Sequence, residues 1–329
     1  MNTILPWHDQ LWQQVMRRWQ QNRLPHALLL CGPQGMGKAL FAQRLTETLL
    51  CNQPRASGPA CGHCKPCLLL NASTHPDLLQ VQPACAGKQI AVDTIRGLIQ
   101  FCSLTASYGH YQIVIVNPAE AMNSNAANSL LKLLEEPPLK TLIMLISHQH
   151  KALIATVRSR CQRLDFSRPD SSVTQTWLRS KLSPELDTQL LLDITAQAPL
   201  AAFTLVETGG IAKRRELFDS LTKLPNGQND PIRIASSWNK FNAAQVLQWM
   251  LSWTMDIIRF ALTKQTQHII NRDCIEPLQR FATQLDLHNL FEMLDLQREA
   301  YQLVTGNANV KPQGLLESIA IAWVKLGTR

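Results

Sequence analysis

Apolar residues in the first half of the chain form short continuous runs, and segments with helical spacing separate these runs. The runs at residues 27–31, 113–116 and 142–146 have the length of strands that are buried on both faces. Residues 126–136 have a helical apolar pattern that ends at Pro137-Pro138, because proline cannot continue a helix. Short buried strands that alternate with helices predict an α/β domain with a parallel sheet covered on both faces.

Helical spacing also marks the segments on either side of the first apolar run. Two sets of apolar residues carry it: Trp12, Met16 and Trp19 before the run, and Leu40, Phe41, Leu45 and Leu49 after it. Residues three or four positions apart lie on one face of a helix, so each set is expected to lie on one buried side.

The strand pattern stops after about residue 166. Residues 167–208 predict small helices, and residues 209–329 predict longer ones. The longer helices carry a stripe that is expected to be buried: Leu247, Met250, Leu251, Met255 and Ile258. Weak breaks near Pro169 and Gly209 divide the chain. We therefore expect three domains, an α/β domain over residues 1–166 and two all-helical domains over residues 167–208 and 209–329.

Composition narrows the class of protein. Of 329 residues, 45% are hydrophobic and 17% are charged, a balance that excludes wholesale disorder. No apolar run approaches the ~18–20 residues that a membrane-spanning helix needs, and the first residues carry no continuous apolar segment of a signal peptide. We expect a cytoplasmic protein without a membrane partner. The net charge of +8 is spread along the chain and does not by itself decide whether nucleic acid is bound.

Residues 32–39, with the sequence GPQGMGKA, match a phosphate-binding loop up to its lysine. The glycines let backbone N–H groups turn toward a phosphate, and the lysine would reach the β- and γ-phosphates. The candidate nucleotide-binding residues are Gly32, Gly35, Gly37 and Lys38. A serine or threonine normally follows the lysine and holds magnesium, but Ala39 has no oxygen to offer.

The acidic residues of such a site are also missing. After the strand at residues 113–116, an active enzyme would carry an aspartate at position 117 and a glutamate at position 118, where this chain has Asn117 and Pro118. Glu120 lies two residues further on and is expected on another side of the turn. The sequence therefore predicts a vestigial site that binds ATP weakly or not at all and does not hydrolyse it.

Four cysteines lie within seventeen residues, at Cys51, Cys61, Cys64 and Cys67. The C-x9-C-x2-C-x2-C spacing lets four thiolates surround one ion, and a closed four-cysteine site leaves no open position for catalysis. We expect a structural zinc module over about residues 51–67. His63 and Cys85 lie close enough in sequence to substitute as ligands, and a redox role for Cys61 and Cys64 is the alternative.

Three further motifs give the chain a resemblance to a known family. They are residues 74–77 (THPD), residues 128–138 (NSLLKLLEEPP) and Ser159-Arg160-Cys161. Together with the zinc insertion after the phosphate-loop helix, they resemble the AAA+ clamp-loader subunits of bacterial DNA polymerase III. The resemblance is firm over residues 1–166 and looser beyond. It implies an AAA+ domain, a helical lid over residues 167–208 and an oligomerising collar over residues 209–329.

The family has two zinc-bearing types. The motor subunit (gamma/tau) keeps the hydroxyl and the acidic pair, and the delta-prime type has often lost them and serves as a stator. Ala39, Asn117 and Pro118 resemble the delta-prime type, and residues 196–201 offer no second sensor arginine. Ser147 aligns by spacing with the motor's sensor threonine. The resemblance implies a subunit without intrinsic ATPase activity, within a polymerase holoenzyme, that helps to load a sliding clamp on primed DNA.

Arg160 is the candidate for a catalytic role in trans. In the family, the arginine of this motif reaches the γ-phosphate of a neighbour's ATP, and a guanidinium suits this role because it stays charged and spreads its donors. Arg158 is the nearby alternative. The polar ends of the preceding motif, Lys132 and Glu135-Glu136, are candidates for contact with a neighbouring subunit or DNA. The implied partners are gamma/tau motor subunits, the clamp-opening delta subunit, the sliding clamp and primer–template DNA.

Two other functions stay open at this stage. The first is an active gamma/tau-type ATPase, which turnover by the isolated chain would reveal. The second is a zinc-dependent nucleic-acid-binding adapter, which would bind DNA tightly by itself.

Overall fold

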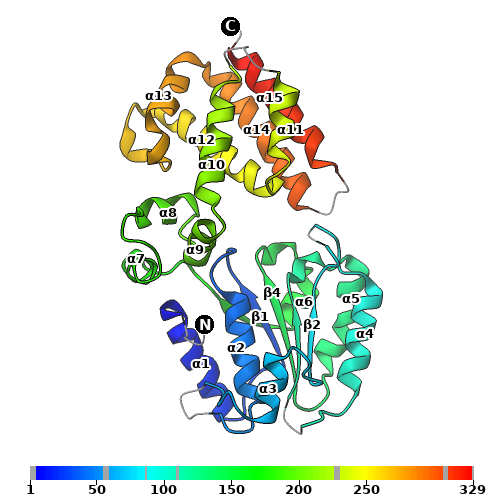
Figure 1. The fold of residues 1–329 in the computed structure, drawn as a ribbon. Coiled ribbons are helices and arrows are strands. Elements are labelled where there is room, and N and C mark those ends of the chain that lie inside the picture. The colour runs from blue at the N-terminus through cyan, green and yellow to red at the C-terminus, as the bar shows by residue number, and fades with distance from the viewer. Residues whose placement is uncertain are drawn as a thin grey trace. The chain divides into compact units, whose positions relative to one another are not determined.

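A computed structural model describes residues 5–54, 59–85, 87–108, 111–225, 230–306 and 310–327. The chain divides into two compact units, Met1–Thr174 and Gln175–Arg329 (Figure 1). The second unit has one buried core to which residues on both sides of position 208 contribute. The finer division into a lid and a collar at this position stays a prediction.

The first unit is built on a five-stranded sheet with the strand order β2-β3-β4-β1-β5. All four strand pairs are parallel. The strands are β1 (Ala27–Cys31), β2 (Leu78–Val81), β3 (Gln112–Val116), β4 (Thr141–Ser147) and β5 (Gln162–Asp165). Every residue of β1, β3 and β4 is buried, as expected for central strands covered on both faces. The predicted parallel α/β domain is therefore confirmed.

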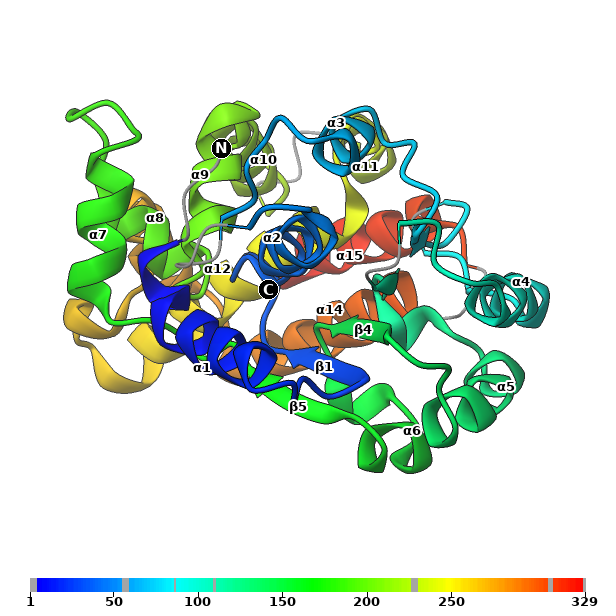
Figure 2. The ribbon, with the colours of Figure 1, turned by 90° about the horizontal axis from the view of Figure 1, so that it is seen from below.

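Six α-helices accompany the sheet. They are α1 (Asp9–Gln20), α2 (Lys38–Leu50), α3 (Lys65–Asn71), α4 (Val92–Ser103), α5 (Ser124–Glu135) and α6 (Ala155–Ser159). Helices α4, α5 and α6 share a buried cluster with alternate residues of β1, β3 and β4, and α2 lies on the opposite face (Figure 2). Short 3-10 helices at Pro6–His8 (η1), Ala119–Ala121 (η2) and His150–Ala152 (η3) complete the unit.

The helix after the phosphate loop differs in one respect from the predicted pattern. Phe41, Leu45 and Leu49 are buried, but Leu40 is 42% exposed. The three buried residues are four positions apart and form one stripe, and Leu40 lies about 100° away from Phe41 around the helix. Leu40 was wrongly assigned to the buried side.

The described part of the second unit is helical, as predicted. It contains α7 (Ser171–Arg179, which begins in the first unit), α8 (Thr188–Ile194), α9 (Pro199–Glu207), α10 (Gly210–Thr222), α11 (Pro231–Trp238), α12 (Ala243–Thr263), α13 (Ile275–Gln284), α14 (Leu287–Thr305) and α15 (Pro312–Gly327). Short 3-10 helices lie at Thr266–His268 (η4) and Arg272–Cys274 (η5). No single helix among the described residues is both long and apolar enough to cross a membrane, and α8 with α9 passes that test only as a pair bent by 108°.

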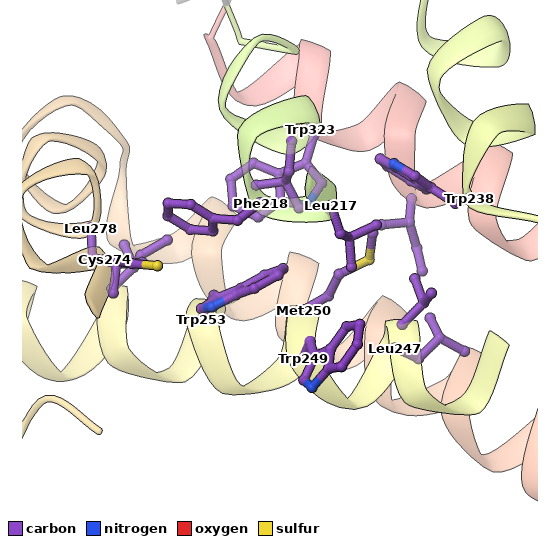
Figure 3. Close-up of a cluster of buried hydrophobic side chains, with 14 of the residues drawn as sticks. Leu217, Phe218, Trp238, Leu247, Trp249, Met250, Trp253, Cys274, Leu278 and Trp323 are labelled. Carbon is purple, nitrogen blue, oxygen red and sulfur yellow. The ribbon is translucent and has the colours of Figure 1, made fainter. Parts of the chain in front are cut away.

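Three fully buried tryptophans, Trp238, Trp253 and Trp323, form much of the core of the second unit (Figure 3). The predicted stripe on α12 is only partly right, since Met255 is 40% exposed and Leu251 is half-buried. The buried side of α12 instead includes Trp249 and Trp253. Aromatic side chains of this size bury more area than the leucines and methionines that the prediction relied on.

A charged network is buried beside this core. Asp256 accepts hydrogen bonds from the backbone N–H groups of Ile270 (2.9 Å) and Asn271 (2.8 Å), from Asn271 Nδ2 (2.7 Å) and from Arg259 Nη1 (2.8 Å). Arg214 donates to Asn271 Oδ1 (2.6 Å) and to Asp273. These contacts attach the segment after α12 to α10 and α12.

Candidate functional site

The phosphate loop joins the buried strand β1 to the start of α2. The backbone at Phe166 lies so close to position 32 that only glycine fits there, because a Cβ would be 2.3 Å from the carbonyl oxygen of Phe166. Gly35 (φ 81°) and Gly37 (φ 88°) both have left-handed backbone conformations that favour glycine. The predicted loop therefore has the backbone that its glycines indicate.

Lys38 is bound within the loop itself. Its Nζ donates to the carbonyl oxygens of Gly32 (2.5 Å) and Pro33 (2.7 Å), and the residue is buried. Desolvation lowers the pKa of Lys38 to about 8, and the nearby carboxylate of Glu120 acts in the opposite direction. Two of the three N–H donors of the ammonium that would reach a phosphate thus bind the loop itself.

The segment before α1 fixes the same loop from the other side. Trp7 Nε1 (3.1 Å) and His8 Nε2 (2.7 Å) both donate to the carbonyl oxygen of Met36. The ring of His8 packs edge-on against Phe41 and Phe166, with centroids 5.7 and 5.1 Å apart. Burial lowers the pKa of His8 to about 4, so the ring is neutral at pH 7. Neither donor was predicted from the sequence.

The carboxyl ends of β3 and β4 carry the remaining parts of the predicted nucleotide site. Glu120 was expected to face away, but its Oε1 accepts hydrogen bonds from the backbone N–H groups of His148 (2.8 Å) and Gln149 (3.3 Å), directly after β4. The 3-10 turn at Ala119–Ala121 directs the side chain toward this loop. Glu120 therefore ties the end of β3 to the end of β4.

Four buried polar atoms at these strand ends have no hydrogen-bond partner among the described residues. They are Asn117 Oδ1, Glu120 Oε2, Ser147 Oγ and His148 Nδ1. Such atoms are normally paired, so ordered water or a small polar group would stabilise them. With Asn117 and Pro118 in place of acids and Ala39 in place of a hydroxyl, the set lacks the side-chain hydroxyl after the lysine and the acidic pair that organise magnesium for hydrolysis.

The four predicted cysteines lie together. The Sγ atoms of Cys51, Cys61, Cys64 and Cys67 are all within 4.8 Å of one another. The shortest separations that join them are 3.9, 3.9 and 3.4 Å, whereas a disulfide would need about 2.05 Å. Zinc bonded tetrahedrally to sulfur at about 2.3 Å holds its four ligands about 3.8 Å apart, so the donor set and the spacing both fit zinc.

Backbone N–H groups support this cluster. Cys51 Sγ accepts from the N–H groups of Gln53 (3.4 Å) and Cys61 (3.2 Å), and Cys61 Sγ accepts from that of Cys64 (3.4 Å). Hydrogen bonds of this kind favour thiolates, which are the form that binds metal. His63 and Cys85, the candidate substitutes, are not part of the cluster.

Arg160 lies on the same unit, directly after α6. Its Nε donates to Glu135 Oε1 (2.7 Å), its Nη2 forms an ion pair with the same oxygen, and its Nη1 donates to the carbonyl oxygen of Thr156 (3.0 Å). The Arg160 side chain is 34% exposed. The alternative, Arg158, has a buried Nε without a hydrogen-bond partner among the described residues. Arg160 and Arg158 are both half-buried, and the guanidinium of Arg160 is held by Glu135 and by the carbonyl oxygen of Thr156.

Comparison with known proteins identifies the family. Residues 7–170 match a family model described as DNA polymerase III, delta subunit, and residues 209–325 match the model of its C-terminal part. A DNA polymerase III subunit delta′ from Pseudomonas aeruginosa is 37% identical over 328 residues, which cover 99% of both chains. The chain belongs to the DNA polymerase III delta′ family. Delta′ subunits from Escherichia coli (32% over 256 residues, 77% of this chain and 76% of that one) and Bacillus subtilis (29% over 309 residues, 92% of each) are also similar.

Membership of the delta′ family confirms the resemblance drawn from the motifs. Lys38 lies against the glycine loop, and the four cysteines lie together in a separate cluster. The structure adds Trp7 and His8, which bind the loop, and Glu135, which binds Arg160. The leucine motif made Glu135 a candidate for an outside contact, but the sequence carried no signal that it binds Arg160 or that Trp7 and His8 bind the loop.

Proposed function

We propose that this chain is the stator of a clamp loader, a delta′ subunit that does not hydrolyse ATP itself. The observation that carries the proposal is the state of the phosphate loop. Lys38 binds the loop's own carbonyl oxygens, and the next residue, Ala39, has no hydroxyl for magnesium. A site in this state has its lysine engaged by two carbonyl oxygens and has no hydroxyl beside it to hold the metal.

The chemistry that remains belongs to Arg160. In a loader, this guanidinium would reach the γ-phosphate of ATP on a neighbouring motor subunit, where negative charge develops on the phosphate oxygens during transfer. Arginine fingers of this kind contribute rate factors on the order of 10³–10⁵. Its position after the short helix α6, on the surface of the first unit, supports this role.

The partners follow from the same assignment. They are gamma/tau motor subunits, the clamp-opening delta subunit, the sliding clamp and primer–template DNA in the assembled complex. In this proposal, residues 167–208 form the lid, residues 209–329 form the collar that holds the subunits together, and Cys51, Cys61, Cys64 and Cys67 hold one structural zinc ion. The zinc site leaves no position open for a substrate.

An ATPase assay tests the first part. The isolated chain should show no magnesium-dependent turnover above background, and Ala39→Thr should not restore it, because Asn117 and Pro118 still lack the acids. An authentic motor subunit in the same assay is the positive control. Turnover that scales with the concentration of the wild-type chain and survives repurification would contradict the proposal.

A reconstituted loader tests the second part. Arg160→Ala should leave assembly intact and abolish turnover at the single site that this chain completes, which slows clamp loading. Arg160→Lys should rescue little, since an ammonium on a flexible stem lacks the planar fork. Unchanged turnover with Arg160→Ala, in a complex that assembles normally, would overturn the assignment and make Arg158 the next candidate.

A further inference from the structure

We propose that Glu135 is a positioning residue for the arginine finger, one that fixes the guanidinium of Arg160 with its phosphate-binding edge free. The inference rests on the proposed function of Arg160. It assigns a role within the chain to a residue that the leucine motif offers as an outward contact.

The hydrogen bonds of Arg160 define an orientation. A guanidinium has five N–H bonds in one plane. Glu135 Oε1 accepts along the edge formed by Nε and Nη2, and the carbonyl oxygen of Thr156 accepts from Nη1 (3.0 Å). These three contacts leave one N–H on Nη1 and one on Nη2, and two such donors can bind two phosphate oxygens together.

The carboxylate stands on a rigid support. Glu135 is the last residue of α5, whose Leu130 and Leu134 are buried in the same cluster as Val157 of α6. The carbonyl oxygen of Leu134 accepts a hydrogen bond from His26 Nε2 (2.9 Å), at the start of β1. Both ends of the Glu135–Arg160 contact are therefore held by the packed core of the first unit.

The exposure of the pair indicates orientation rather than stability as its role. The side chains of Arg160 and Glu135 are 34% and 49% exposed. Exposed ion pairs contribute little to the stability of a fold, so the loss of Glu135 should leave the domain folded. The same pair restricts the rotamers of the long Arg160 side chain. Because the guanidinium is then already oriented, it loses less conformational entropy when it binds the phosphate.

Two substitutions at position 135 distinguish a positioning role from an effect of the negative charge. A glutamine at position 135 keeps an oxygen that accepts from Nε and Nη2 but carries no charge, and an alanine removes both. If the role is positioning, glutamine should retain most of the function. Asp93 is an exposed carboxylate of the same unit that pairs with Arg96 and has no role in the proposed site, so Asp93→Ala is a matched control.

The experiment uses a loader in which the motor subunits have lost their own finger arginines, so that turnover reports only the site completed by this chain. Glu135→Ala should lower kcat by about tenfold with little change in the KM for ATP, because the finger acts in the transition state. Glu135→Gln should stay within about threefold of wild type, and Asp93→Ala should match wild type. Glu135→Ala combined with Arg160→Ala should be no slower than Arg160→Ala alone.

Each contrary result has a distinct meaning. If Arg160→Ala lowers kcat and Glu135→Ala does not, the positioning role is wrong and the proposed function stands. If Arg160→Ala has no effect in an assembled loader, the proposed function fails and this inference fails with it. Additive losses in the double variant, or a loss in Glu135→Ala that follows reduced assembly or a lowered Tm, would make Glu135 an independent structural residue.

Discussion

At the scale of single residues, burial decides the charge state beside the phosphate loop. Lys38 and His8 are both buried, and desolvation lowers the pKa of each, to about 8 and about 4. Desolvation disfavours the charged form of any group that leaves water. The loop is therefore built around a lysine that its own carbonyl oxygens hold and a histidine that stays neutral.

His8 should make the stability of the first unit depend on pH. In the unfolded chain the ring binds a proton near pH 6.5, but in the folded chain it does so only near pH 4. The unfolded state thus holds more protons in this window, so stability falls as the pH falls from 6.5 to 4, by at most about 3 kcal/mol. Urea unfolding of the wild type and of His8→Gln across these pH values measures this loss of stability.

Glutamine at position 8 keeps a neutral N–H donor for Met36 and cannot titrate. In a plot of unfolding free energy against pH, the variant should therefore lack the part of the slope that corresponds to about one proton between pH 6.5 and 4. Equal slopes in the two proteins would mean that His8 is accessible to protons in the folded state.

At the scale of elements, position in the sheet decided which strands could be predicted. Strands β1, β3 and β4 are central and buried on both faces, so they appear in the sequence as continuous apolar runs. Strands β2 and β5 lie at the edges, and β5 buries only Leu164. Edge strands keep polar residues toward solvent, and four residues of mixed polarity give no periodic signal.

At the four-cysteine cluster, the proposed zinc ion would make the stability of the surrounding segment depend on one ligand set. Purified protein should contain about one zinc ion per chain, and Cys64→Ser should lower this ratio toward zero, because a four-sulfur site loses a ligand that no neighbour replaces. Hydrogen exchange of the variant should increase around α3 and leave the central strands protected. Metal analysis and exchange measured by mass spectrometry together check this.

Cys85→Ser is the control for the zinc module, since Cys85 is exposed and lies outside the cluster. It should keep the metal and the protection of α3. Reduced, folded wild-type protein that contains no zinc after purification without chelators would contradict the assignment of the four cysteines.

At the scale of the whole molecule, the two units have separate cores and separate stabilising devices. The first depends on a sheet covered on both faces. The second depends on its buried tryptophans (Figure 3) and on the hydrogen bonds around Asp256. Asp256 is fully buried, and it accepts from Arg259 and from two backbone N–H groups. Removal of one partner from a buried charged network typically costs about 3–5 kcal/mol.

Asp256→Ala should therefore lower the unfolding transition of the second unit by several degrees or more and leave the zinc content and the first unit unchanged. Calorimetry, with hydrogen exchange to assign each transition, measures this. Asp295→Ala removes an exposed carboxylate that pairs with Arg298 at 3.6 Å, and it should cost less than about 1 kcal/mol. Equal effects of the two substitutions, or an equal shift of both units, would contradict separate cores.

The sequence by itself determined the features that depend on residue type at short spacing. The alternation of strands and helices, the four cysteines, the loss of a hydroxyl at Ala39 and the loss of acids at Asn117 and Pro118 are all local. The helix that ends before Pro137-Pro138 also had a readable apolar pattern, and it is found as α5. These features follow from backbone periodicity and from the chemistry of the side chains, which a sequence states directly.

Only the tertiary structure decided which polar groups meet. His8 binds the carbonyl oxygen of Met36 across 28 positions, and Glu135 binds Arg160 across 25. Glu120 reaches the loop after β4 because a 3-10 turn directs it there. Such pairs arise when distant elements pack, and a single sequence carries no periodicity that relates their members. The missing chemistry of the site was therefore readable in the sequence, and the contacts that hold Lys38 and orient Arg160 required the fold.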